Sequence, residues 1–235
     1  MNLPHRRGAQ FCVAFLFLYL AAIPVPLLGQ SGLAPAVEPE NHAITVDRLM
    51  RYHDSGEYER QIREVANAAR EYLEKKFPEK SKNEKVAAVF DIDETSLSNW
   101  DVMAECGFCA YSVQAKLHPD PHGPAIAPVL ELYDFAKSKG IALFFITGRP
   151  EKQRQLTIDN LREAGYEGWA DLIMQPDTAA GAKRIPARIF KPRNRLDIEK
   201  RGYRIVLSIG DQASDLAGCC AERVFKLPNP FYLVE

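Results

Sequence analysis

The sequence lacks several features that would assign it to common classes of protein. No G-x-G-x-x-G follows any of its apolar runs, which argues against a Rossmann-type cofactor-binding domain. Its 30 basic and 31 acidic residues give a formal net charge of −1, so charge offers no case for binding nucleic acid or an anionic membrane surface. It has no internal repeat and no low-complexity stretch. What remains is a chain of 235 residues, 46% hydrophobic, which suits one globular domain of ordinary size.

Charge is also absent from residues 11–29, an apolar run that follows two arginines. A basic start, an apolar run and small residues beyond it are typical of a secretory signal, which we place at about residues 1–36. An uncleaved membrane anchor is the alternative, because the run approaches spanning length, but Pro24 and Pro26 would interrupt its last third. We therefore expect an exported protein, periplasmic or secreted, without stable membrane insertion after cleavage.

Cysteine is scarce, with five residues in all, and one of them, Cys12, lies in the predicted signal. The others are Cys106, Cys109, Cys219 and Cys220. An even number in an exported chain is compatible with one or two disulfides, with free buried thiols as the alternative. A zinc site is not favoured, because the adjacent pair does not match the C-x₂-C spacing of such sites. The pattern leaves the pairing open.

The apolar pattern predicts a helical segment followed by an α/β core. Apolar residues with three-and-four spacing indicate helix between Ile44 and Phe77, within an N-terminal segment that we place at 37–83. The core, 84–235, alternates buried runs with helical patterns, which predicts a parallel sheet flanked by helices. We expect strands at 86–90, 141–146 and 203–209, helices at 128–139 and 150–164, and a short helix after 210.

Residues 99–125 interrupt this alternation and are rich in Pro, His and Cys. The stretch has no clear period and is too long for a plain connection, so we expect a small cap or flap. Its aromatic residues Trp100, Phe108 and Tyr111 would either stack on a substrate ring or pack within the cap. Within "HPDPHG", His118 and His122 are separated by a Pro-broken loop, which favours a structural loop over a metal site.

Polar residues of a definite kind follow each of the three predicted strands. Asp91 and Asp93 follow the first, Thr147 begins the Thr-Gly-Arg after the second, and Asp211 and Asp215 follow the third. Ligands bind at the carboxyl ends of the strands in open parallel sheets, so we expect these side chains to meet there. Several carboxylates in one place need a cation. Mg²⁺, which also binds phosphate oxygens, is the expected ion.

The spacing of the first two aspartates suggests phosphoryl transfer. Asp91 would attack phosphorus as a carboxylate nucleophile. Asp93, when protonated, would donate its proton to the leaving alkoxide and then accept one from the hydrolysing water. The hydroxyl of Thr147 and the backbone N–H groups next to it, those of Gly148 and Arg149, would bind the phosphate oxygens as the substrate-binding residues.

Four segments, in order, resemble the motifs of the haloacid dehalogenase (HAD) superfamily. They are "FDIDETSLSN", "FFITGR", "GYRIV", and "GDQASDL" with "FKLPNPFY"; "NLREAGYEGWADLI" adds to the likeness, which spans about Glu84 to Tyr232. More narrowly, the chain resembles the exported acid phosphatase branch, subfamily IIIB, related to class B and C acid phosphatases and plant vegetative storage proteins. The resemblance implies a Rossmann-like α/β fold and a Mg²⁺-dependent acid phosphatase for small phosphomonoesters, with a homo-oligomer left open.

The resemblance also implies a role for each matched residue. Asp91 would be the nucleophile and a metal ligand, and Asp93 the acid–base group that ligates the metal through its backbone carbonyl. Asp211 would ligate the metal, and Asp215 would do so directly or through water. Thr147 would be the phosphate-binding hydroxyl.

The third motif of the family is a lysine shortly before the third strand. "IFKPRNR" places Lys191 there as the catalytic lysine, with Arg195 behind it, and Lys183 is the alternative. The chain departs from its relatives after "SN", where they often continue with Pro and paired tyrosines and this chain has "WDVMAECGFCA". That segment would face the substrate, so the substrate preference of relatives does not transfer.

Two other functions are compatible with the same fold. A non-enzymatic storage or binding protein is one, although some storage relatives are expected to lack the nucleophile and this chain retains Asp91. A phosphotransferase, which passes the phosphoryl group to an alcohol instead of water, is the other.

Overall fold

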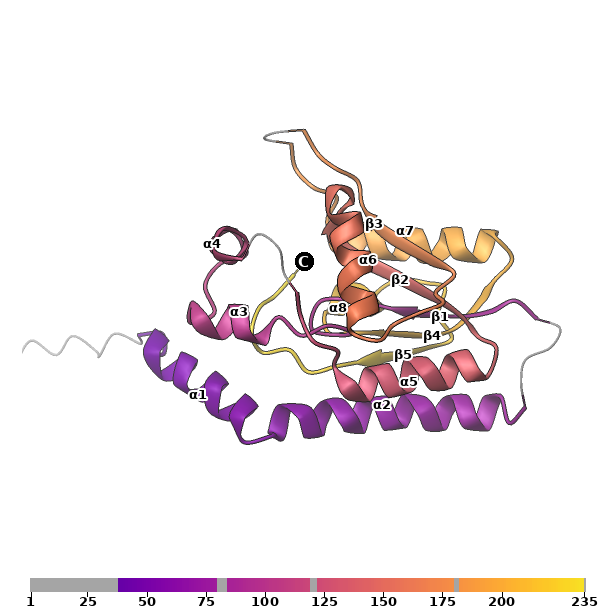
Figure 1. Ribbon diagram of the computed structural model, residues 1–235, viewed down its shortest axis with the longest axis horizontal. Helices are drawn as coiled ribbons and strands as arrows, with labels where there is room; N and C mark the ends of the chain where they lie inside the picture. Colours follow the sequence, from indigo (N-terminus) through magenta and orange to yellow (C-terminus); the bar gives the residue numbers. More distant parts are fainter. Residues whose placement is uncertain (1–37, 80–83, 119–121, 180–181, 235) are drawn as a thin grey trace, which may run out of the picture. The chain divides into compact units, whose positions relative to one another are not determined.

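The computed structural model describes residues 38–79, 84–118, 122–179 and 182–234, and a five-stranded parallel sheet lies at its centre (Figure 1). The strand order is β3-β2-β1-β4-β5, and all four pairings are parallel. The bounds are β1 Val86–Phe90, β2 Ala142–Pro150, β3 Asp171–Gln175, β4 Arg204–Gly210 and β5 Arg223–Lys226. The predicted α/β class is confirmed.

The helices connect and cover these strands. Their bounds are α1 His42–Asp54, α2 Glu57–Lys76, α3 Trp100–Glu105, α4 Tyr111–Leu117, α5 Ala127–Ser138, η1 (a 3₁₀ turn) Glu151–Gln153, α6 Arg154–Glu163, α7 Ala187–Lys200 and α8 Ala213–Leu216. The predicted helical stretch from Ile44 to Phe77 is helical but divided. Its break is at Gly56, whose φ of 79° lies in the left-handed region that glycine adopts easily.

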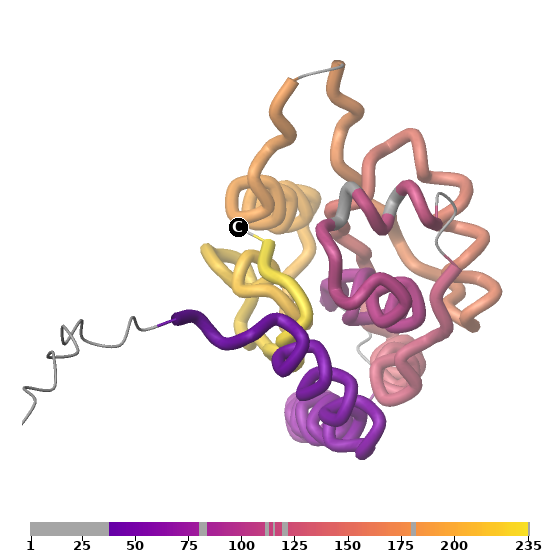
Figure 2. The backbone as a smooth tube through the Cα atoms, turned by 90° about the vertical axis from the view of Figure 1, so that its left-hand side faces the viewer, coloured from indigo at the N-terminus to yellow at the C-terminus, as the bar shows by residue number. Residues whose placement is uncertain are grey.

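The sheet is buried on both faces, as a continuous apolar strand requires. Ala88 and Phe90 of β1 belong to the larger core cluster, whereas Ala87 and Val89 belong to the smaller one. Successive side chains of a strand point to opposite faces, so the two clusters are the two faces of the sheet. Seen from the carboxyl ends of the strands, α2 and α5 lie on one side and α7 on the other (Figure 2). Helix α2 is therefore packed into the same core as the sheet.

The two edge strands are the parts of the sheet that the apolar pattern did not predict. In β5 only Phe225 is buried, so the strand has no apolar run. In β3 buried and half-buried residues mix, and its ends are Asp171 and Gln175. Edge strands are exposed on one side and need fewer apolar residues than central strands. Strand β2 is also longer than expected, because Thr147, Gly148 and Arg149 fall inside it after a register shift beyond Ile146.

The segment expected to form a cap contains two short helices, α3 and α4, and a disulfide between Cys106 and Cys109. The side chain of Trp100 stacks on His53 of α1, with ring centroids 3.6 Å apart and planes at 7°. Trp100 also contacts Phe108 and Phe231. Of the two uses considered for these aromatic rings, Trp100 and Phe108 adopt internal packing, and the Tyr111 side chain lies outside the described residues.

Several sequence predictions fall on parts of the chain that the structure does not describe. The signal at residues 1–36 is one, and the centre of "HPDPHG", residues 119–121, is another. The two histidines of that stretch lie beside different acids. His118 Nε2 is 2.7 Å from Glu105 Oε2, and His122 Nδ1 is 3.1 Å from Glu163 Oε2. Among the described helices, none is both long and apolar enough to span a bilayer.

Candidate active site

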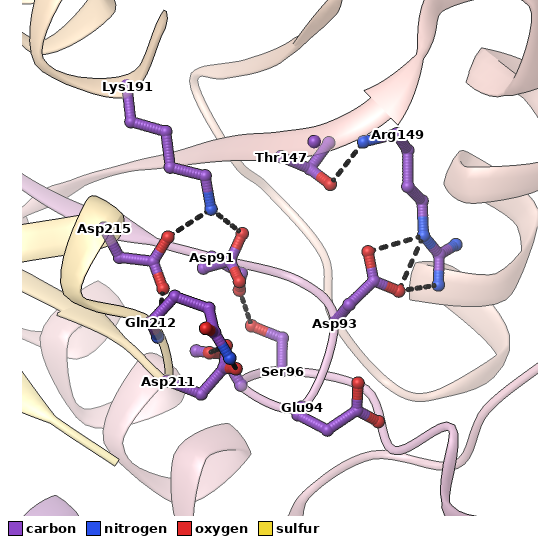
Figure 3. Close-up of polar contacts among 12 residues, drawn as sticks. Asp91, Asp93, Glu94, Ser96, Thr147, Arg149, Lys191, Asp211, Gln212 and Asp215 are labelled. Carbon is purple, nitrogen blue, oxygen red and sulfur yellow. Dashed lines mark hydrogen bonds and ion pairs between the residues drawn. The ribbon is translucent and has the colours of Figure 1, made fainter. Parts of the chain in front are cut away.

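The order of the strands reverses at β1. From β1 the chain adds β2 and β3 on one side, and then β4 and β5 on the other. Such a switch point leaves a crevice at the carboxyl ends of the strands. The chain turns there immediately after Phe90, and the Ser96 hydroxyl closes the turn by donating to the Asp91 carbonyl at 2.6 Å. The polar residues predicted from the ends of β1, β2 and β4 gather around this turn (Figure 3).

Three carboxylates form a buried cluster at the switch point. Each of Asp91, Asp211 and Asp215 offers an oxygen within 4.8 Å of the other two, and all three residues are buried. The ammonium group of Lys191, from α7, lies between two of them. It donates to Asp91 Oδ1 at 2.6 Å and to Asp215 Oδ1 (Figure 3). The alternative lysine, Lys183, is exposed.

The charges of this cluster do not balance. Burial, reinforced by the neighbouring Asp215, raises the pKa of Asp91 well above its ordinary value, and burial likewise raises the pKa of Asp211. Burial alone would lower the pKa of Lys191, but the charges of Asp91 and Asp215 outweigh it and raise that pKa. Three carboxylates and one ammonium group carry a net charge of −2 when all are ionised.

The cluster fits a divalent cation. A charge of +2 would neutralise it, and its donors are carboxylate oxygens, which Mg²⁺ prefers over nitrogen or sulfur. Asp91, Asp211 and Asp215 are the residues that would hold the ion. The carboxylate of Asp93, the fourth predicted ligand, is not part of the cluster, and a role for its backbone carbonyl stays a prediction.

Neutral hydrogen-bond donors fix the orientation of Asp211. Thr95 Oγ1 donates to its Oδ1 at 2.9 Å, and the side-chain amides of Gln212 and Asn229 donate to its Oδ2 at 2.6 and 2.7 Å. Among the described residues no cation forms an ion pair with Asp211, whereas Lys191 pairs with Asp91. The carboxylate is therefore oriented without being neutralised, which is suitable for a metal ligand.

Asp215 is held by contacts at the start of α8, Ala213–Leu216, and by Arg195 of α7. Its Oδ2 accepts the backbone N–H of Gln212 at 2.8 Å, completing a capping box at the start of α8. The guanidinium of Arg195, which is 1% exposed, donates to the Asp215 carbonyl at 2.5 Å, to the Ala217 carbonyl and, at 3.3 Å, to the Cys219 carbonyl. One buried arginine therefore fixes the backbone that carries Asp215.

The segment after α8 contains the second disulfide, between the adjacent residues Cys219 and Cys220. All four cysteines considered for pairing are therefore in disulfides, each joining near neighbours in the sequence. Free thiols, which were the alternative, are not found at these four positions.

Strand β2 supplies a hydroxyl and an open stretch of backbone. Thr147 is fully buried, and its Oγ1 accepts the backbone N–H of Arg149 at 3.1 Å. A Cβ added at Gly148 would meet no atom within 4 Å, so the backbone there faces open space. A ligand can therefore approach the Gly148 backbone closely, and binding of phosphate there and at Thr147 stays a prediction.

Asp93 lies on the other side of the turn from the cluster and pairs with Arg149 (Figure 3). Arg149 Nε lies 3.0 and 3.2 Å from the two carboxylate oxygens, and its NH2 lies 2.8 Å from Oδ1. Asn99 Nδ2 donates to Oδ1 at 3.0 Å. Burial raises the pKa of Asp93, but the charge and hydrogen bonds of Arg149, together with Asn99, outweigh burial and hold that pKa below its ordinary value.

The surroundings of Asp93 add one role that the sequence prediction did not include. The backbone N–H of Arg149 was predicted to bind phosphate, which stays a prediction, and its guanidinium orients the predicted acid–base group, a role that the sequence did not suggest. The Arg149 side chain is only 5% exposed. Its charge favours the carboxylate form of Asp93, which is the form that accepts a proton.

Glu94 is a buried acid that the sequence reasoning missed. It has a φ of 54°, and burial, with the nearby Asp93 and Asp211, raises its pKa to about 8. Its Oε2 accepts the Tyr232 hydroxyl at 2.7 Å, and its Oε1 accepts the Asn99 backbone N–H at 2.6 Å. Glu94 thereby connects the motif turn to the cap and to the C-terminal segment. The available signals were its place inside the motif and the "PNPFY" that contains Asn229 and Tyr232.

Comparisons with known proteins agree with this site. A family model described as HAD superfamily, subfamily IIIB (Acid phosphatase), matches residues 33–235. "Acid phosphatase 1" of Solanum lycopersicum is 32% identical over 196 residues, which are 80% of this chain and 74% of that protein. "Vegetative storage protein 1" of Arabidopsis thaliana is 34% identical over 151 residues, 62% of this chain and only 54% of that protein.

A solved structure supports the fold. The crystal structure of the class C acid phosphatase from Bacillus anthracis with tungstate bound superposes with a TM-score of 0.63 and 22% identity, covering 81% of this chain and 86% of that one. The family match covers most of the chain, including every strand and the four motifs. The chain therefore belongs to the acid phosphatase family of the HAD superfamily, subfamily IIIB, and by that membership it is classed as a phosphomonoesterase.

Proposed function

We propose that this protein is an exported, Mg²⁺-dependent acid phosphatase that hydrolyses phosphomonoesters through an aspartyl-phosphate. The observation that carries the proposal is the buried cluster of Asp91, Asp211 and Asp215 with Lys191, next to the open backbone at Gly148. A nucleophile, a cation site and an anion-binding backbone are the parts that phosphoryl transfer needs.

In the first step, a carboxylate oxygen of Asp91 attacks phosphorus and the bond to the ester oxygen breaks. Asp93, protonated, transfers its proton to the leaving alkoxide. The Thr147 hydroxyl and the Gly148 N–H bind the equatorial oxygens, while the charge of Lys191 favours the ionised form of Asp91 and its hydrogen bond orients the carboxylate. When bound, Mg²⁺ would offset the negative charge shared by the carboxylates and the phosphoryl group.

In the second step, water attacks the phosphorus of the aspartyl-phosphate and transfers a proton to Asp93. The bond from phosphorus to the Asp91 oxygen breaks, which releases phosphate and restores the carboxylate. Asp93 therefore alternates between acid and base. Because Arg149 lowers the pKa of Asp93, the protonated form is favoured only at acidic pH, which suits an acid phosphatase.

The test is phosphate release from p-nitrophenyl phosphate by the purified protein. We expect release with Mg²⁺, its loss after EDTA and its recovery when Mg²⁺ is returned. Asp91→Asn should lower kcat by about four orders of magnitude or more, because no nucleophile remains, with an unchanged circular dichroism spectrum. Asp134→Asn, at an exposed position on α5, is the matched control and should retain activity. Full activity in Asp91→Asn would overturn the mechanism.

Product analysis separates hydrolysis from transfer. With added glycerol, a hydrolase releases phosphate in proportion to the p-nitrophenol formed, whereas a phosphotransferase accumulates glycerol phosphate. A storage protein would do neither.

Export is supported by the two disulfides, which persist in oxidising compartments. Sequencing the N-terminus of the protein recovered from the producing cells would test cleavage near residue 36.

A further inference from the structure

The segment from Lys183 to Arg195 is strongly basic in a chain that is otherwise close to neutral. It contains six basic residues and no acidic one, and the nearest acids in the sequence are Asp177 and Asp197. Two of the six, Lys191 and Arg195, are buried and belong to the site described above. The other four are exposed: Lys183, Arg184, Arg188 and Arg193.

Exposed cations of this segment differ from those of α2 in their partners. On α2, Arg60, Arg63 and Arg70 each form an ion pair with a glutamate three or four residues away. Within the described residues, by contrast, neither Lys183 nor Arg188 has an ion pair or a hydrogen bond from its side chain. Their charge is therefore not neutralised by the protein, and it is available to an anion from solution.

The position of this segment places the charge beside the phosphate site. The Arg184 guanidinium donates to the Gly148 carbonyl, so it lies against the backbone proposed to bind the phosphoryl group. Helix α7 precedes β4 in a parallel sheet, so its first turn lies at the carboxyl ends of the strands. The connection before α7 extends out from this edge (Figures 1 and 2).

Arg188 is three residues before Lys191 on α7 and thus on the same side of the helix, about one turn nearer its start. Lys191 reaches Asp91, the proposed nucleophile, at 2.6 Å. Arg188, being exposed, therefore lies on the solvent side of that contact. An anion bound there would lie on the side of α7 that carries Lys191, which contacts the proposed nucleophile.

We propose that Lys183, Arg184 and Arg188 form a subsite for a second phosphate group on the substrate. The preferred substrates are then small bisphosphorylated molecules, in which one phosphate enters the Asp91 cluster and the other pairs with this segment. Arginine guanidinium groups suit the second phosphate because they bind its oxygens with two parallel hydrogen bonds. The inference rests on the proposed phosphatase function, and it names the substrate class of that same site.

The experiment compares fructose 1,6-bisphosphate with its two monophosphates, fructose 1-phosphate and fructose 6-phosphate, in the presence of Mg²⁺. At low ionic strength, we expect kcat/KM for the bisphosphate to exceed that for the better monophosphate by about tenfold, through KM. Raising the salt concentration should reduce this ratio, because exposed charges are screened.

Variants assign the preference to this segment. Arg188→Gln and Lys183→Gln should each lower the bisphosphate-to-monophosphate ratio toward one. Arg162→Gln is the matched control, since Arg162 is also exposed and has no ion pair within the described chain. It lies in the last turn of α6, which leads into β3 and is therefore at the amino ends of the strands. The control variant should leave the ratio unchanged.

The outcomes separate the two proposals. No phosphate release from any of the three sugars or from p-nitrophenyl phosphate overturns the proposed function and the subsite with it. Release from the monophosphates with a ratio near one overturns the subsite alone, as does a ratio that neither variant changes.

Discussion

Asp91 and Asp93 are two residues apart, yet the protein gives them opposite surroundings. Asp91 faces two other buried carboxylates and one lysine, and burial raises its pKa. Asp93 faces an arginine and an asparagine amide that together hold its pKa low in spite of burial. One short turn therefore supplies two different environments. Asp91 belongs to a cluster that needs added positive charge, whereas the proton affinity of Asp93 is lowered by the neighbouring Arg149.

The strongest test of this difference removes Lys191, the cation that pairs with Asp91 and Asp215. Lys191→Met should abolish turnover and lower the free energy of unfolding by about 3–5 kcal/mol, because buried carboxylates lose their partner. Added Mg²⁺ should restore part of the lost stability by occupying the same cluster. Urea unfolding with and without Mg²⁺ measures both effects. Lys137→Met, on the exposed end of α5, is the control, and equal stability of the two variants would contradict the charge imbalance.

A smaller effect is expected when the cluster is displaced without changing its charge. A Cβ at Gly210 would lie 2.6 Å from Cγ of Asp215, so Gly210→Ala should push Asp215 away. We expect kcat to fall by about 100-fold and the Mg²⁺ concentration needed for activity to rise. Gly148→Ala offers the comparison for stability, because its Cβ would enter open space and the melting temperature should not change. Equal stability of both variants would show that Asp215 can move aside at no cost.

On the Asp93 side the expected change is in pH dependence. Arg149 lowers the pKa of Asp93, so Arg149→Gln should raise it. The first step requires protonated Asp93, which is present below that pKa, and the alkaline limb of the kcat profile should therefore move to higher pH. We also expect kcat at its optimum to fall by about tenfold, because the carboxylate is less well oriented. An alkaline limb that stays in place would mean that a different group donates the proton.

The smallest effect is expected for Asn99→Ala, which removes one neutral donor from Asp93 and another from Glu94. The alkaline limb should move in the same direction as in Arg149→Gln but less far, because a neutral amide stabilises the carboxylate less than a guanidinium does. The free energy of unfolding should fall by about 1 kcal/mol. A larger displacement than in Arg149→Gln would reverse the order of the two contributions.

The fold could be predicted where the apolar pattern is continuous. β1, the inner part of β2, and β4 lie in the centre of the sheet, so each reads as an unbroken apolar run. β3 and β5 are edge strands without such runs, and the pattern missed them. The division at Gly56 was missed for a different reason, since one glycine within a helical pattern does not by itself end a helix.

The site residues were predictable to the extent that they follow the apolar part of a strand. Asp91 and Asp211 directly follow β1 and β4, and Thr147 follows the apolar run of β2; a parallel sheet brings such positions together whatever the intervening sequence is. Glu94 and Arg195 were not assigned, because their importance depends on partners far away in the chain. Glu94 accepts the hydroxyl of Tyr232, 138 residues later.

The sequence by itself therefore determined the class of the fold, the motifs and the need for positive charge among the carboxylates, because these follow from local patterns of apolar and acidic residues. Only the tertiary structure decided which cation each carboxylate faces: Lys191 for Asp91, and Arg149, 56 residues distant, for Asp93. The physical reason is that charge pairing depends on distance in space, which the order of the strands and the packing of α7 establish.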